Sequence, residues 1–91
     1  MGLLDMAIEK YEKSLTLKAD NAEVRNNLGI AYGKKGLIDR AIEELESVVK
    51  VMPDYATARN NLAHAYALKG WADKAREQRR IAGELMVRNR R

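Results

Sequence analysis

The sequence repeats itself with a period of 34 residues. Residues 22–55 and 56–89 are identical at 13 of 34 aligned positions, and residues 2–21 match residues 36–55 at 8 of 20 positions. A fixed period of this length is typical of solenoids, in which similar units stack and bury their apolar faces against one another. We therefore expect a partial repeat at 2–21, a full repeat at 22–55, and a third at 56–89 whose second half has diverged.

The apolar residues of each repeat recur at helical spacing, and no segment shows the alternation that is typical of a strand. Gly36 and Gly70 each follow a lysine, which fits a helix that closes in the left-handed conformation. Asp20 and Asp54 are candidate N-caps, and Asp20 has Glu23 at capping-box spacing. The pattern predicts five helices, over residues 3–18, 22–35, 38–51, 55–69 and 72–88.

The residues that recur within the repeat resemble a known signature. In the full repeat they read Leu28-Gly29-x-x-Tyr32, Ala41-x-x-x-Leu45 and Pro53, and the next repeat keeps Leu62-Ala63-x-x-Tyr66 and Ala75. This pattern is similar to the tetratricopeptide repeat, a helix–turn–helix unit of 34 residues. Arg25 and Arg59 depart from it, since that family has tryptophan there. The resemblance implies an all-α, right-handed solenoid of helical hairpins, a single domain over residues 1–91 that ends in a capping helix.

The composition fits one small soluble domain. The 91 residues are 46% apolar and 33% charged, with one proline and no cysteine. No apolar run approaches the roughly 20 residues that span a bilayer, and the start of the chain does not resemble a signal peptide. We therefore expect no membrane insertion, a cytoplasmic location and no disulfide bonds.

By the same resemblance, the first helices of successive repeats line a concave groove that holds a peptide or a helix of a partner protein. A side-chain amide offers both donors and an acceptor, so Asn27 and Asn61 at 34-residue spacing can hold a ligand backbone whatever its sequence. They resemble the asparagine ladder in the repeats of O-GlcNAc transferase. The alternative is that such asparagines bond within the repeat array. The expected groove residues are Asn26, Asn27, Ile30, Lys34, Asn60, Asn61, His64 and Leu68, and the resemblance also places Glu23, Gly33, Thr57 and Ala67 on the groove side.

The sequence offers no recognisable chemistry for catalysis. It contains no strand–Ser–helix elbow, no glycine-rich phosphate loop and no convergent acid–base pair. His64 is the single histidine, and without cysteine it has no usual set of metal ligands. We interpret Gly29 and Gly33 as positions of close helix packing. The sequence therefore predicts a non-catalytic interaction module that needs neither a metal nor a cofactor.

Each end of the chain suggests an alternative function. No helix precedes the first one to cover its apolar residues, so either the sequence is part of a longer array or a second copy covers them and forms a dimer at high concentration. This predicted self-association face consists of Leu4, Ala7, Ile8 and Tyr11. Residues 69–91 hold 8 basic and 3 acidic side chains, and such a basic stripe can bind nucleic-acid phosphates. With Trp71 as the only aromatic residue near it, nucleic acid is not an expected partner.

Overall fold

The structure is a computed structural model that describes residues 2–89, and within this range it contains helices and no strand. The helices are α1 (Leu3–Leu17), α2 (Ala22–Lys35), α3 (Ile38–Val51), α4 (Ala56–Leu68) and α5 (Ala72–Asn89). The predicted all-α class and the five helices are confirmed. The bounds of α2 and α3 are as predicted, and those of the other helices differ by one residue at one or both ends.

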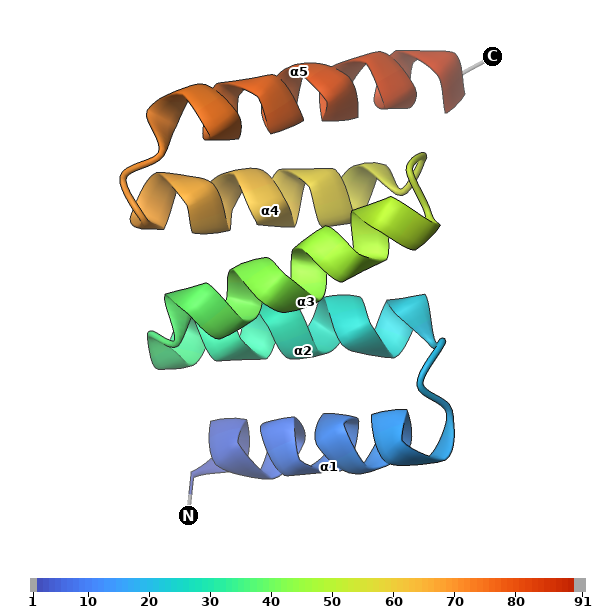
Figure 1. The fold of residues 1–91 in the computed structure, drawn as a ribbon, viewed down its shortest axis with the longest axis vertical. Helices are drawn as coiled ribbons and strands as arrows, with labels where there is room; N and C mark the ends of the chain where they lie inside the picture. The colour runs from blue at the N-terminus through green and yellow to red at the C-terminus, as the bar shows by residue number, and fades with distance from the viewer. Residues whose placement is uncertain (1, 90–91) are drawn as a thin grey trace.

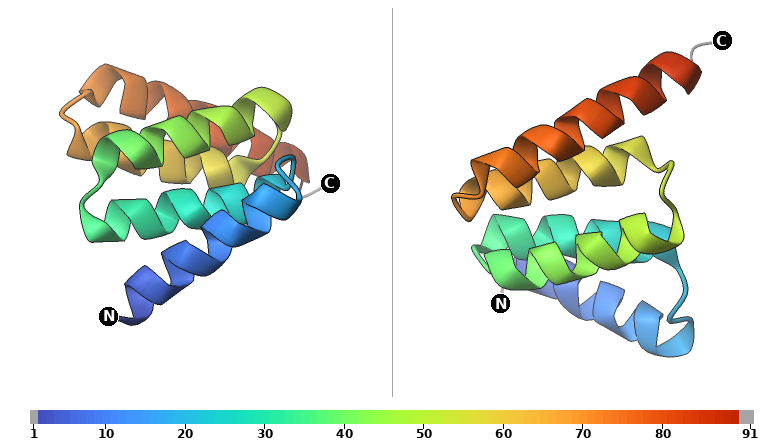
Figure 2. Two further views of the ribbon diagram at one scale, coloured as in Figure 1. Left: turned by 60° about the horizontal axis from the view of Figure 1, so that its bottom comes forward. Right: turned by 45° about the horizontal axis from the view of Figure 1, so that its top comes forward.

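The helices follow one another along the long axis of the molecule (Figure 1). α2 and α3 form one antiparallel hairpin, α4 and α5 form the next, and α1 packs against α2 (Figures 1 and 2). α3 packs against α4 and so joins the two hairpins, and α2 also touches α4 directly. This stack is the predicted solenoid, and it brings the first helices of two successive repeats side by side.

Two glycines set the turns inside the hairpins. Gly36 and Gly70 have φ angles of 86° and 88°, which lie in the left-handed region that favours glycine. After each glycine the next residue closes the helix end: the N–H of Leu37 donates to the Tyr32 carbonyl and that of Trp71 to the Tyr66 carbonyl, both at 2.9 Å. The two turns are therefore built alike, 34 residues apart.

The predicted N-caps of α2 and α4 are wrong by one residue. Asn21, not Asp20, caps α2, and its side-chain oxygen accepts from the N–H of Val24 at 3.1 Å. Tyr55, not Asp54, caps α4, and its side chain makes no capping bond. The reason is that the backbone carbonyls of Asn21 and Tyr55 already accept the first helical hydrogen bonds, which leaves both aspartates in the preceding turns.

The core follows the stack. Its largest fully buried side chains are Leu28 on α2, Leu45 and Val48 on α3, and Leu62 on α4. Gly29 allows α2 to approach α3 closely, because a Cβ atom at this position would lie 2.8 Å from Cγ of Leu45. The close helix packing that the sequence predicts at Gly29 is therefore confirmed.

Two tyrosines fasten each repeat to the preceding one. Tyr32 donates its hydroxyl proton to Glu12, and Tyr66 donates its own to Glu46, both at 2.6 Å. Burial, together with the hydrogen bond to Glu12, raises the pKa of Tyr32 to about 12. Burial and Glu46 raise the pKa of Tyr66 in the same way. Both tyrosines therefore stay protonated and act as donors.

Ion pairs repeat with the same period. Lys35 pairs with Asp5, and Lys69 pairs with Asp39 at 2.7 Å, so each joins a first helix to the second helix of the preceding repeat. On α5 the position that corresponds to Glu12 and Glu46 is occupied by Arg80. α5 therefore does not offer the carboxylate that α1 and α3 offer to a following tyrosine.

Candidate binding groove

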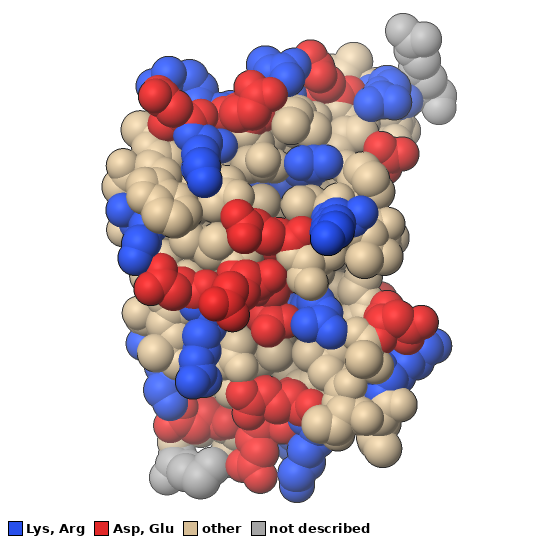
Figure 3. All heavy atoms as spheres, viewed as in Figure 1, with Lys and Arg blue, Asp and Glu red and all other residues tan. Residues whose placement is uncertain are grey.

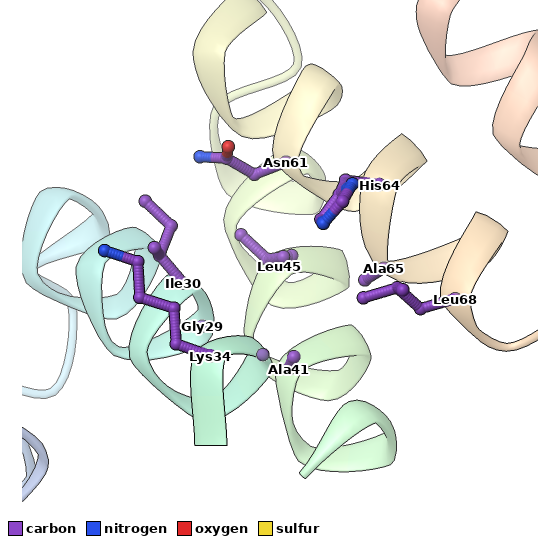
Figure 4. A pocket seen from close by; sticks show the side chains of 10 residues that line it. Gly29, Ile30, Lys34, Ala41, Leu45, Asn61, His64, Ala65 and Leu68 are labelled. Carbon is purple, nitrogen blue, oxygen red and sulfur yellow. The ribbon is translucent and has the colours of Figure 1, made fainter. Parts of the chain in front are cut away.

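A hollow opens between α2 and α4, and α3 forms its floor (Figure 4). Its volume is about 170 Å³. The apolar part of the lining comes from all three helices: Gly29, Ile30 and Gly33 from α2, Ala41 and Leu45 from α3, and Ala65 and Leu68 from α4. The polar part comes from Lys34, Asn61 and His64.

The hollow exists because α2 carries two glycines one turn apart on this side. A Cβ atom on Gly29 would meet Leu45, whereas one on Gly33 would lie 4.0 Å from Cβ of Ala41, at ordinary contact distance. The corresponding positions of α4 are Ala63 and Ala67. Gly29 therefore brings α2 close to Leu45, and Gly33 leaves the α2 side of the hollow without a side chain at a position where α4 has Ala67.

The asparagines of the groove divide into two kinds. Asn26 is 3% exposed, and its side-chain oxygen accepts a hydrogen bond from Nδ2 of Asn61 at 3.1 Å. This bond links α2 to α4, which is the bonding within the array that the sequence left as an alternative. Among the described side-chain hydrogen bonds Asn61 makes this one, so its Oδ1 and second N–H can still serve a ligand. Asn61 lies at the edge of the hollow (Figure 4).

The remaining polar groups stand on opposite walls. Lys34 extends from α2 and His64 from α4, with the hollow between them (Figure 4). Both residues are exposed. No carboxylate lines the hollow. This part of the groove therefore carries positive charge beside an apolar floor.

The structure brings together five of the eight expected groove residues, which are Ile30, Lys34, Asn61, His64 and Leu68. Asn26 is buried beneath them, Asn27 is half-buried, and Asn60 is exposed without lining the hollow. Gly33, which was also expected on the groove side, lines the hollow, whereas Gly29, Ala65 and the two floor residues of α3, Ala41 and Leu45, were not among the expected groove residues. At Gly29 the available signal was the missing side chain, because the close approach of α2 that it allows brings Leu45 to the base of the hollow.

The predicted self-association face needs one correction, at Ile8. This residue is 8% exposed and belongs to the main core, because α1 turns this side toward α2. Leu4, Ala7 and Tyr11 are half-buried. Two apolar side chains outside the expected set, Leu3 and Met6, are 85% and 44% exposed. The exposed apolar side of α1 is therefore displaced toward Leu3 and Met6.

Two of the five basic residues of α5 pair with carboxylates of the same helix. Arg76 pairs with Asp73 at 3.2 Å, and Arg80 pairs with Glu77 at 2.6 Å and with Glu84 at 2.9 Å. The hydrogen bond from Arg80 lowers the pKa of the Glu77 carboxyl. Figure 3 shows acidic and basic side chains interspersed over this end of the molecule. Arg90 and Arg91, which belong to the basic cluster in the sequence, lie outside the described residues.

Two further properties concern the described chain as a whole. Among residues 2–89, no His, Cys, Asp and Glu side chains gather in a group of three or more that could hold a metal ion. None of the five helices is both long enough and apolar enough to cross a membrane.

Comparison with known proteins identifies the repeats. A family described as TPR repeat matches residues 1–36, and one described as Tetratricopeptide repeat matches residues 22–55. The resemblance stated from the sequence is thereby confirmed. A search of curated proteins found no match.

Three similar solved structures are all of MamA. A crystal structure of MamA has a TM-score of 0.87 and 27% identity over 94% of this chain. The structure MamA MSR-1 C2 has a TM-score of 0.87 and 26% identity over 94%. A further MamA crystal structure has a TM-score of 0.81 and 28% identity over 90%. Our chain covers 50%, 49% and 45% of these chains, so it spans about half of their length.

Proposed function

We propose, because this chain belongs to the tetratricopeptide-repeat family, that it is an interaction module that holds a peptide or a helix of a partner protein between α2 and α4. Members of this family are typically non-catalytic scaffolds, and the proposal assigns no reaction to the chain. In this proposal residues 1–91 form a single domain with repeats at 2–21, 22–55 and 56–89. The ligand is a protein or peptide, and no cofactor takes part.

The observation that carries this proposal is the hollow between α2 and α4. It combines an apolar floor with an amide at its edge, and Asn61 retains an acceptor and a donor that a ligand backbone can use. A peptide laid across such a surface gains affinity by burying apolar side chains, while hydrogen bonds to its backbone fix its position. Asn27 stands 34 residues before Asn61 and is half-buried on α2 outside the lining of the hollow, where it is a second amide that an extended peptide could reach.

The experiment begins with a displayed library of random 12-residue peptides selected on the 91-residue protein. Backbone amide chemical shifts of the protein are then followed during titration with the selected peptides. Shift changes gathered on α2 and α4 support binding in the groove. Changes confined to α1 or α5, or a selection that enriches no peptide, contradict it.

A second candidate function is self-association through α1, favoured by the exposure of Leu3 and Met6 beside the half-buried Tyr11. Burying apolar surface contributes about 25 cal/mol per Å², so a partner copy on this side would stabilise both chains. Light scattering over a hundredfold dilution tests the idea, with Met6→Glu as the disrupting variant. A constant monomer mass at every concentration would rule this function out. The internal ion pairs of α5 do not favour the nucleic-acid alternative.

A further inference from the structure

The hollow between α2 and α4 has room for one apolar side chain. Its volume is about 170 Å³, its floor is formed by Ala41 and Leu45 of α3, and Gly29 and Gly33 line its α2 side. Apolar cavities of about 150 Å³ in proteins stay dry and accept a molecule of the size of benzene. The side chains of leucine, methionine and phenylalanine are of this size. The hollow is open to solvent, so a side chain of this kind that enters it removes apolar surface from water, which is favourable.

The charge beside the hollow determines which ligand residue can lie next to that apolar side chain. Lys34 is in the last turn of α2, and none of the ion pairs among residues 2–89 involves it, whereas the adjacent Lys35 is bound to Asp5. His64 on the opposite wall carries no negative charge. Because the lining contains no carboxylate to balance Lys34, a ligand carboxylate fits this place and a ligand cation is repelled.

We propose that the hollow binds one leucine- to phenylalanine-sized side chain of a partner peptide in which an aspartate or glutamate adjacent to that residue faces Lys34. This inference rests on the proposed function and adds the chemistry of the ligand to it. The apolar side chain contributes most of the affinity by burial, and the carboxylate sets which neighbouring residues the groove accepts.

The glycines of the chain provide a test of the apolar part. Gly33→Leu should place a side chain in the hollow, and a Cβ atom here would make only an ordinary contact, at 4.0 Å from Cβ of Ala41; circular dichroism checks that the variant folds. Gly83→Leu is the matched control, since Gly83 also lies inside a helix and nothing lies within 4 Å of a Cβ atom built on it. Both changes raise helix propensity, and only the first occupies the groove.

The lysines at helix ends provide a test of the charged part. Lys34→Glu reverses the charge beside the hollow. Lys50→Glu is its control, because Lys50 is an exposed lysine in the last turn of α3 and does not line the hollow. The two substitutions place the same charge at the same position relative to a helix end, so their effects on the helix dipole match.

The probes are the peptides selected from the random 12-residue library, measured by isothermal titration. The expected peptides share a leucine, methionine or phenylalanine next to an acidic residue. Gly33→Leu should weaken their binding by roughly tenfold or more, the loss of about 1.4 kcal/mol that accompanies an unburied side chain. Lys34→Glu should weaken them at least about threefold, as expected for one ion pair near the surface. Both control variants should bind like the original protein.

The outcomes separate this inference from the proposed function. Peptides that shift amides on α2 and α4 but keep their affinity for Gly33→Leu would overturn the apolar anchor and leave groove binding intact. Selected peptides that are basic, or that bind Lys34→Glu as well as the original protein, would overturn the acidic preference. If no selected peptide shifts the amides of α2 and α4, the proposed function fails, and this inference fails with it.

Discussion

Replacing Gly29 by alanine should destabilise the protein, although the same change elsewhere in a helix stabilises it. Gly29 is buried in the middle of α2, where alanine gains about 1 kcal/mol in helix propensity over glycine. The new Cβ atom, however, would lie 2.8 Å from Cγ of Leu45, a distance that real Cβ contacts essentially never show. Leu45 is 1% exposed, so the core around it leaves little room to move.

The magnitude follows from these opposing effects. Overpacking a core position costs about 1–3 kcal/mol, so Gly29→Ala should lose between about 0 and 2 kcal/mol in net stability. Gly83→Ala is the control: it lies in α5 with nothing within 4 Å of its Cβ position, and should gain about 1 kcal/mol. Urea unfolding followed by circular dichroism at 222 nm measures both. In thermal melts each kcal/mol corresponds to about 4–8 °C for a domain of this size.

A double-mutant cycle identifies the contact that is responsible. In the background of Leu45→Ala, which itself costs about 2–5 kcal/mol, Gly29→Ala should become stabilising because the clashing atom is absent. If Gly29→Ala stabilises the original protein as much as Gly83→Ala does, the close approach of α2 and α3 at Leu45 is refuted.

Three further predictions concern the groove, the packing phase and pH. Replacing Asn27 and Asn61 together by alanine should weaken a groove-bound peptide by about 1–3 kcal/mol in titration while the circular dichroism spectrum keeps its helical content; equal affinity would remove the amides from recognition. Ala41→Leu should lower the free energy of unfolding by about 1–3 kcal/mol, because Ala41 is 1% exposed and its surroundings are packed. Arg40→Leu, at an exposed position, should change this free energy by less than about 0.5 kcal/mol. Similar urea midpoints for the two variants would contradict the assignment of Ala41 to the buried face of α3. Folding raises the pKa of Tyr32 from 10.0 to about 12, so the stability that its protonated hydroxyl contributes is complete below pH 10 and is lost as the pH rises toward 12. Urea titrations should show that Tyr32→Phe loses less free energy of unfolding over this interval than the original protein does. The same dependence of this free energy on pH in both proteins would contradict the shift.

The sequence by itself determined the elements of this fold and their order. The 34-residue period, the helical spacing of apolar residues and the two lysine–glycine pairs predicted five helices with bounds that differ from the structure by at most one residue at either end. These signals are local: a glycine at positive φ ends a helix through bonds to residues of the preceding turn, whatever lies elsewhere. The N-caps were wrong by one residue because several residues before a helix can cap it, and only backbone geometry selects one.

Most of the groove depended on contacts between repeats, which the period does not encode. Asn26 and Asn60 occupy equivalent positions in the sequence, but Asn26 is buried beneath Asn61 while Asn60 is exposed. The difference arises because α4, the first helix of the next repeat, packs beside α2. Among the described residues no first helix of a further repeat packs beside α4 on its other side.

Only the tertiary structure decided where an absent side chain means close packing and where it means open space. At Gly29 a Cβ atom would collide with Leu45, and one turn later at Gly33 it would have room. Ile8 was predicted to be uncovered and is buried, since the side of α1 that it occupies faces α2. The physical reason is the same in these cases: helical spacing fixes which residues share a face, but the angle and distance at which two helices pack decide what that face meets.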